Sequence, residues 1–342
     1  MIGRAERGRL LGRSTRRRGL RGGTFIQEMG RRTFGLAALA AVIAGLWPAT
    51  ALAAACPTFA SSNQVMGHVQ DTTLNELSDF VASTDNPGVF WTEEDSGNPN
   101  KVYAVNGTGQ IVGEFTIQGT RDIDWEDLAI DRNALGTDDI YVGDIGDNKG
   151  TRDGSNTTGR SRVRLYRFPE PTVSASGPKV TGTITQFDTF VYQYADANGN
   201  PIAPRNSESL MVDPLTHDIY VVEKKVQTIG NVKQNWIFRL HQPRNGVINL
   251  ATKVAITTTA KSYVSADISP SGDIALKAGT VAYIWLRNPA NTVEATFNAS
   301  PAAPCTGSPL IASEAVGWAP DGLWTVPDNT VPAPIVRLAF AP

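Results

Sequence analysis

Short apolar runs separated by tight-turn dipeptides dominate the chain after residue 60. The runs are rich in Val, Ile, Tyr, Phe and Trp, and pairs such as Asp-Pro, Asn-Gly, Ser-Gly and Asp-Gly lie between them. Helical periodicity is almost absent from this part of the chain. Runs of β-branched and aromatic residues bounded by turn residues are typical of strands. The pattern therefore predicts an all-β chain, built as a barrel, a sandwich or a propeller.

A repeated unit favours the propeller among these architectures. Each unit begins with an acidic residue at or beside the head of an apolar run; these acids are Glu76, Glu126, Glu208, Asp267 and Glu314. A second run follows each acid, at residues 88–95, 140–147, 219–225, 273–279 and 322–329. A third run follows at residues 101–105, 162–168, 235–240, 281–286 and 334–340. The five acids are 50, 82, 59 and 47 residues apart, which is the size of a propeller blade with loop insertions.

The last unit reaches residue 342 before a fourth strand, whereas the strand-like residues 63–70 belong to no unit. The economical solution is that this N-terminal strand completes the last blade and closes the ring. We therefore predict a five-bladed β-propeller, with six blades as the alternative if one unit has lost its pattern.

The N-terminal 55 residues have the layout of an export signal. A second methionine, Met29, is followed by Arg31 and Arg32, an apolar run over residues 34–47 and small residues at 51–55. A basic start, a short apolar core and an A-x-A-type cleavage site are typical of a secretory signal, and the arginine pair resembles a twin-arginine signal. The apolar run is too short for an ordinary membrane span. We predict translation from Met29, removal of residues 1–55, and export of residues 56–342 as one propeller domain without an integral membrane segment.

Removal of this segment changes the charge of the chain. Residues 1–55 contain ten of the 31 basic and two of the 33 acidic residues, so the formal net charge moves from −2 to −10. An acidic mature chain argues against nucleic acid as a partner. It fits a cation-binding exported protein, and equally a protein that uses charge for solubility. We expect a monomer.

The chain contains two cysteines, Cys56 and Cys305. In an exported protein an even count indicates one disulfide. Closure of the ring would bring the two residues together, and a loop of 249 residues gives a stabilisation of roughly 5 kcal/mol in the chain-entropy model. The alternative is a lipoprotein anchor on Cys56, although Ala53 stands where a lipobox usually has Leu.

Several motifs resemble those of a mostly uncharacterised group of secreted bacterial β-propeller proteins. The stretches that carry the resemblance are "DWEDLAID", "IYVGDIGDN", "SESLMVDPLTHDIYVVEKK", "SADISPSGD" and "SEAVGWAPDG". The group is related in pattern to phytase-like and gluconolactonase-like propellers. The resemblance implies a propeller fold and export, and the phytase-like relatives imply calcium; it does not identify a substrate.

Topology predicts that the acids converge. Because the second strand of a blade returns antiparallel to the first, the head of one and the tail of the other lie at the same end. Two charges about 6 Å apart repel by roughly 3 kcal/mol at an effective dielectric of about 20, so cations or protons must compensate them. Hard oxygen ligands favour Ca²⁺. The predicted metal ligands are Glu126, Asp127, Asp144, Asp147, Asn148, Glu76, Asp267 and Glu314.

Two function classes remain open. One is a calcium-dependent hydrolase of phosphate esters or lactones, with Glu126 and Glu208 as candidate catalytic bases and with Lys224, Lys149 and Arg152 as ligands for a small anionic substrate. The other is a non-enzymatic propeller that binds a ligand or a protein and uses calcium structurally. A third interpretation of the acids needs no metal, since carboxylates also accept hydrogen bonds from backbone N–H groups at strand heads.

Overall fold

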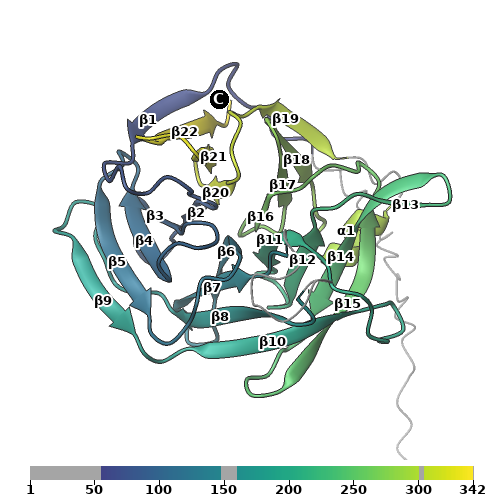
Figure 1. The fold of residues 1–342 in the computed structure, drawn as a ribbon. Helices are drawn as coiled ribbons and strands as arrows, with labels where there is room; N and C mark the ends of the chain where they lie inside the picture. Colours follow the sequence, from purple (N-terminus) through teal and green to yellow (C-terminus); the bar gives the residue numbers. More distant parts are fainter. Residues whose placement is uncertain (1–54, 148–159, 300–303, 342) are drawn as a thin grey trace, which may run out of the picture. The chain divides into compact units, whose positions relative to one another are not determined.

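β-Strands account for nearly all regular structure in the computed structural model, which describes residues 55–147, 160–299 and 304–341. These residues belong to one compact unit, Ala53–Pro342. The strands lie around a common centre (Figure 1). Five short strands are innermost: β2 (Val81–Ala82), β6 (Trp125–Arg132), β11 (Ser207–Val212), β16 (Ser265–Ile268) and β20 (Gly317–Ala319). The prediction of an all-β chain is confirmed.

Each innermost strand begins a group of antiparallel strands that extends outward. The first group continues with β3 (Val89–Thr92), β4 (Lys101–Asn106) and β5 (Ile111–Ile117), and the second with β7 (Asp138–Asp144), β8 (Val163–Pro169) and β10 (Asp188–Ala195). The third continues with β12 (Ile219–Glu223), β14 (Val232–Leu240) and β15 (Ile248–Thr257), and β13 (Gln227–Ile229) pairs with β14. The fourth contains β17 (Ile274–Ala278), β18 (Val281–Trp285) and β19 (Cys305–Pro309). The fifth contains β21 (Gly322–Thr325), β22 (Pro334–Ala339) and β1 (Gln64–His68).

The innermost strands contact one another in succession. Strand β2 contacts β6, β6 contacts β11, β11 contacts β16, β16 contacts β20, and β20 contacts β2. At the outer edge, β5 pairs in parallel with β9 (Val180–Ile184), and β10 pairs in parallel with β15, which joins the second and third groups into one sheet. Antiparallel sheets that radiate from a common centre define the β-propeller class.

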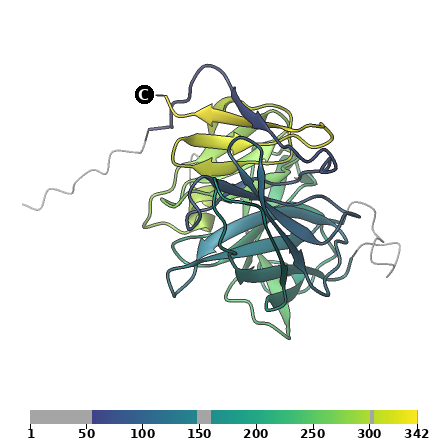
Figure 2. The same cartoon turned by 90° about the vertical axis from the view of Figure 1, so that its left-hand side faces the viewer.

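The N-terminal strand lies beside the C-terminal one. Strand β1 pairs antiparallel with β22, with Gln64 opposite Arg337 (Figure 2). The predicted disulfide between Cys56 and Cys305 is confirmed, with a Cα–Cα distance of 5.7 Å. A covalent link thus joins the chain just before β1 to the first residue of β19.

Apolar side chains fill the space between neighbouring groups. One cluster, which contains Trp91 and Trp125, lies between the first and second groups, and another packs Phe90 against Trp324 between the first and the fifth. Three further clusters lie between the remaining neighbours. Both faces of the inner strands are therefore buried, which explains why these strands are apolar runs rather than alternating ones. Full burial of each large side chain contributes roughly 1.5–3 kcal/mol.

One helix, α1 (Val293–Asn298), interrupts the fourth group and was not predicted. The Thr292 hydroxyl caps it by accepting the Ala295 N–H at 3.1 Å, and Phe297 packs on Trp285 at 5.0 Å between ring centres. Six residues are too few to produce a visible helical period in the sequence. Nowhere in the described chain does a helix have the length and apolar character that a membrane span needs.

Candidate metal centre

Acidic residues gather at one end of the ring, where the innermost strands begin and their neighbours end. Trp125, at the start of β6, is opposite Asp144, at the end of β7. Leu77, ahead of β2, forms a bridge with Glu94, beyond β3. We call this end the acidic mouth and define it by the residues Glu94, Asp95, Asp124, Glu126, Asp144, Glu208, Glu223 and Glu314.

Three carboxylates of the mouth form its tightest group. Asp95, Asp124 and Glu126 each place an oxygen within 4.8 Å of the other two. Asp124 is fully buried, and Glu126 is 2% exposed. Gly146 makes this approach possible, because a Cβ at that position would lie 1.9 Å from Oε1 of Glu126 and 2.7 Å from Oδ2 of Asp124. The glycine in "GDIGDN" is therefore a condition for the group to form.

The environment of Glu126 favours its protonated form or a bound cation. Burial raises the pKa of Glu126 well above its usual value, and repulsion from Glu208 and Asp95 raises it further. The positive charge of Lys224 lowers the pKa of Glu126, but by less than burial raises it. A site with this imbalance gains free energy from any cation that replaces the proton.

A buried carboxyl follows close by, for which the described residues provide no hydrogen-bond partner. Glu93 is fully buried, and neither of its oxygens is hydrogen-bonded to any of the residues that the structure describes. Burial is the largest cause that raises the pKa of Glu93, and repulsion from the charges of Asp122, Asp79 and Asp95 raises it further. Burial also raises the pKa of Asp122 to about 8. An unsatisfied buried carboxyl is costly, so this side of the mouth has a deficit of positive charge.

The opposite side of the mouth contains its own cation. Lys224 Nζ pairs with Glu208 Oε2, and the Asn206 amide donates to Glu208 Oε1 at 3.2 Å. Burial lowers the pKa of Lys224, but the attraction of Glu208 outweighs it and the pKa is raised. Burial and repulsion by Asp328 raise the pKa of Glu314 to about 7. Lys224 therefore pairs with Glu208 and also feels the charges of Glu314 and Glu126.

Asp127 serves a different purpose from its neighbour Glu126. Its Oδ2 accepts the backbone N–H groups of Leu210 at 2.5 Å and of Ala266 at 3.1 Å. Asp79 accepts the Leu128 N–H at 3.1 Å in the same manner. Carboxylates in or just before one innermost strand thus hold the backbones of other innermost strands, as in the third interpretation of the sequence.

Asp144 and Asp147 are bound by an arginine that the sequence analysis missed. Arg160 Nη2 lies 2.8 Å from Asp144 Oδ1, and Arg164 lies 3.4 Å from Asp144 Oδ2. The Arg160 backbone N–H donates to Asp147 Oδ2 at 2.9 Å. Four of the predicted ligands are therefore divided among three environments: Glu126 in the first, Asp127 in the second, and Asp144 and Asp147 in the third. The sequence feature that could have revealed this arginine is the basic stretch "RSRVR" at residues 160–164, which follows the acidic loop.

The other predicted ligands lie in different places. Glu76 accepts the Asn98 amide at 2.7 Å and stays at the rim of the mouth. Asp267 accepts the Trp318 N–H at 2.7 Å and lines a cavity at the opposite end of the ring, so it does not join the group around Glu126. The remaining predicted residues, Asn148, Lys149 and Arg152, lie outside the described residues.

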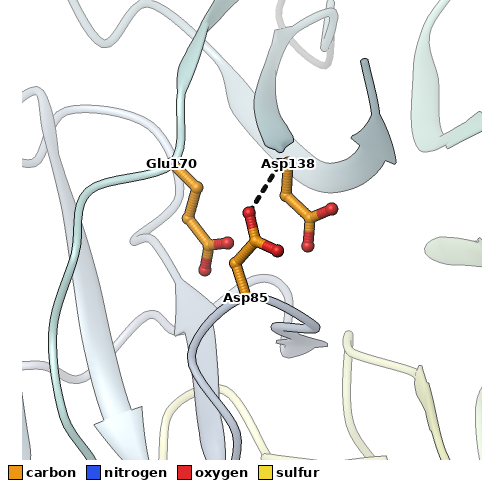
Figure 3. A group of neighbouring side chains, drawn as sticks. All are labelled: Asp85, Asp138 and Glu170. Carbon is orange, nitrogen blue, oxygen red and sulfur yellow. Dashed lines mark hydrogen bonds between the residues drawn. The ribbon is translucent and has the colours of Figure 1, made fainter. Parts of the chain in front are cut away.

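A second group of acids, Asp85, Asp138 and Glu170, lies near the turn between β2 and β3 (Figure 3). Asp85 accepts the Asp138 N–H at 2.8 Å. Arg132 lies 2.6 Å from Asp85 and 3.6 Å from Asp138. The Trp91 indole donates to Glu170 at 2.5 Å. Arg132 already offsets part of the charge of this group through Asp85 and Asp138, so the group has less need of a metal than the one at the mouth.

The donor atoms at the mouth suit a hard cation. Asp95, Asp124 and Glu126 offer only carboxylate oxygens. His217 and His241 lie elsewhere, paired through Nδ1 with Asp131 and Asp218 at 2.7 Å each. Oxygen ligands without imidazole or thiolate fit Ca²⁺ better than Zn²⁺ or copper.

No protein-family model matches the chain, and no curated protein matches it in sequence. Among solved structures, it is similar to a gluconolactonase from Xanthomonas campestris, with 12% identity, a TM-score of 0.36, and coverage of 84% of this chain and 99% of that one. It is also similar to the WD40 β-propeller domain of Doa1, with 10% identity, a TM-score of 0.35, and coverage of 81% and 97%. Similarity at this level transfers no activity, and the propeller class rests on the strand order described above.

Proposed function

We propose that this chain is a calcium-binding β-propeller protein with the cation held at the acidic mouth by Asp95, Asp124 and Glu126. The observation that carries the proposal is the approach of three carboxylate oxygens to within 4.8 Å, two of them on buried residues. The unsatisfied Glu93 beside them is a second, independent indication that positive charge is missing there. Ca²⁺ takes six to eight oxygens, so backbone carbonyls or water would complete the shell.

A hydrolase of phosphate esters or lactones is the activity that this mouth supports best. A bound calcium ion would polarise a carbonyl or phosphoryl oxygen. Lys224, beside Glu208, is placed to attract an anionic group, and Glu208 is a candidate base once substrate draws Lys224 away from it. The alternative is a binding module in which calcium only stabilises the fold.

Two measurements separate these possibilities. Tb³⁺, a luminescent substitute for Ca²⁺, should be sensitised by Trp125, which precedes Glu126 in the chain, and should be displaced by calcium. Hydrolysis of p-nitrophenyl phosphate and of γ- and δ-lactones should then be measured with calcium and with chelator. Binding without turnover supports the binding module, whereas absence of sensitised luminescence removes the calcium site and the hydrolase together.

We also propose that the five groups of strands are the five blades of a closed ring, with β1 as the outer strand of the last blade. The pairing of β1 with β22 and the contact between β20 and β2 support this proposal. A sixth sheet in an experimental electron-density map would contradict it.

Export of residues 56–342 completes the proposal. The disulfide supports it, because such bonds persist in oxidising compartments. Mass spectrometry of the exported protein should give Cys56 as the first residue, with no lipid attached. Replacement of Arg31 and Arg32 by lysine should block export if the signal is of the twin-arginine type.

A further inference from the structure

A cavity of about 1020 Å³ lies at the end of the ring opposite the acidic mouth. Its wall is formed where β2, β6, β16 and β20 end and where the turns to their neighbours begin. The volume is that of a pocket for a drug-sized molecule. Nothing in the function proposed above uses this cavity.

The charge of the wall has one sign. Three aspartates line it, Asp267, Asp273 and Asp321, and the described part of the chain contributes no Lys, Arg or His to the lining. Asp321 is paired with Arg337 outside the cavity. Asp273 accepts hydrogen bonds from the backbone N–H of Arg287 and from the Ser271 hydroxyl. It has no ion pair with any described residue.

Asp267 is the innermost of the three. Its oxygens accept the backbone N–H groups of Ile268 at 2.8 Å and Trp318 at 2.7 Å, and no described cation pairs with it. Two N–H donors orient the carboxylate but do not cancel its charge. A carboxylate in mostly apolar surroundings therefore lacks a counter-ion here.

Four aromatic residues also line the cavity: Phe90, Trp318, Trp324 and Phe340. Trp318 stacks on Phe340 with 6.1 Å between ring centres, and Trp324 packs against Phe90 at 4.6 Å. The backbone N–H of Trp318 bonds to Asp267, and both residues line the cavity, so the same wall contains an indole and a carboxylate without a described cation. An aromatic face beside a carboxylate is the chemistry that recognises an organic ammonium group.

We propose that this cavity binds an organic cation, an amine or quaternary ammonium on an apolar body, with Asp267 as counter-ion and the tryptophans as walls. A neutral apolar ligand would leave the Asp267 charge without compensation, and an anion would be repelled by Asp267 and Asp273. The site is separate from the calcium site, so either can fail without the other.

The test uses benzyltrimethylammonium, its neutral isostere neopentylbenzene and the anion phenylacetate, titrated at pH 8 in excess calcium and followed by tryptophan fluorescence. The cation should bind at least tenfold more tightly than the neutral isostere, and the anion should not bind. Equal affinity for the cation and the neutral isostere would overturn the proposal.

Variants locate the site. Asp267→Asn should weaken binding of the cation at least tenfold. Because Asp267 also accepts two backbone hydrogen bonds, the fold is sensitive to that change. Ser271, exposed on a turn of the wall, allows a pair of substitutions that leaves the Asp267 hydrogen bonds intact. Ser271→Lys should weaken binding of the cation about tenfold, whereas Ser271→Met, with a side chain of similar length, should change the affinity less than threefold. Loss of binding in Glu208→Gln, or no effect of Ser271→Lys, would place the cation elsewhere and contradict the proposal.

Discussion

Arg160 Nη2 lies 2.8 Å from Asp144 Oδ1, and neither side chain is more than 1% exposed. The same arginine donates to the Gly146 carbonyl at 2.9 Å. One residue thus neutralises an acid of the mouth and fixes the loop whose glycine lies against Asp124 and Glu126. The metal centre proposed above therefore rests on Asp95, Asp124 and Glu126 rather than on Asp144.

Removal of this arginine should be strongly destabilising. Arg160→Met leaves the Asp144 charge buried with one weaker partner, and breaking a buried pair costs about 3–5 kcal/mol. Arg164→Met is the matched control, because Arg164 is 32% exposed and lies 3.4 Å from the same carboxylate. That control should cost less than about 1 kcal/mol. Denaturant unfolding measures both, and equal losses would mean that the buried pair has no special weight.

Gly146→Ala should eliminate the metal response without unfolding the sheets. The added methyl group would have to displace the Glu126 and Asp124 side chains, which its Cβ would approach to 1.9 and 2.7 Å. Strand content by circular dichroism should stay unchanged, while calcium should no longer raise the melting temperature. Gly107→Ala, where an added Cβ would come no closer than 3.4 Å to its neighbours, controls for a general effect of glycine replacement. A calcium response of wild-type size in Gly146→Ala would show that the metal lies elsewhere.

The disulfide should contribute several kcal/mol to stability. Cys56 and Cys305 are 249 residues apart, and the chain-entropy model gives about 5 kcal/mol for a loop of that size. A Cys56→Ala/Cys305→Ala protein should unfold at lower denaturant concentration, and added reductant should lower wild-type stability but not that of the variant. The interpretation fails if reductant acts equally on both proteins.

Stability in calcium-free buffer should fall as the pH rises from about 5 to about 7. Burial outweighs the opposing Arg205 charge and raises the pKa of Glu223 from 4.5 to about 7, and burial raises that of Asp267 from 3.8 to about 7. Between these values the folded state binds more protons than the unfolded state, so each group destabilises the fold by on the order of 1 kcal/mol per pH unit. Glu223→Gln should make the decline shallower, and an unchanged slope would assign it to other groups.

The strand groups could be predicted from the sequence because the residues that mark each strand lie within or next to it. Apolar runs and turn dipeptides mark each strand, and a repeated acid marks each unit, so the partners of β6 or β12 needed no knowledge of distant residues. The disulfide followed from two cysteines and one topological argument. The short helix α1 left no period to detect.

The candidate site was harder to predict because side-chain direction decides it. Glu126 and Asp127 are adjacent, yet one joins Asp95 and Asp124 while the other bonds to the backbones of Leu210 and Ala266. A bulge between Trp125 and Asp127 changes the alternation at this point. Asp95 ends the run at residues 88–95 and Asp124 opens the "DWED" motif, but neither was predicted as a ligand. Long-range pairs such as Arg160 with Asp144 leave no mark in the local pattern.

Calorimetric titration of calcium into wild-type protein, Asp95→Asn and Asp85→Asn tests the central claim most directly. Asp95 belongs to the group at the mouth, and Asp85 belongs to the second acidic group and is paired with Arg132. We expect one calcium ion per wild-type chain, at least tenfold weaker binding in Asp95→Asn, and wild-type affinity in Asp85→Asn. Absence of a calcium heat in the wild type, or equal affinity in the wild type and Asp95→Asn, would contradict a metal centre at the acidic mouth.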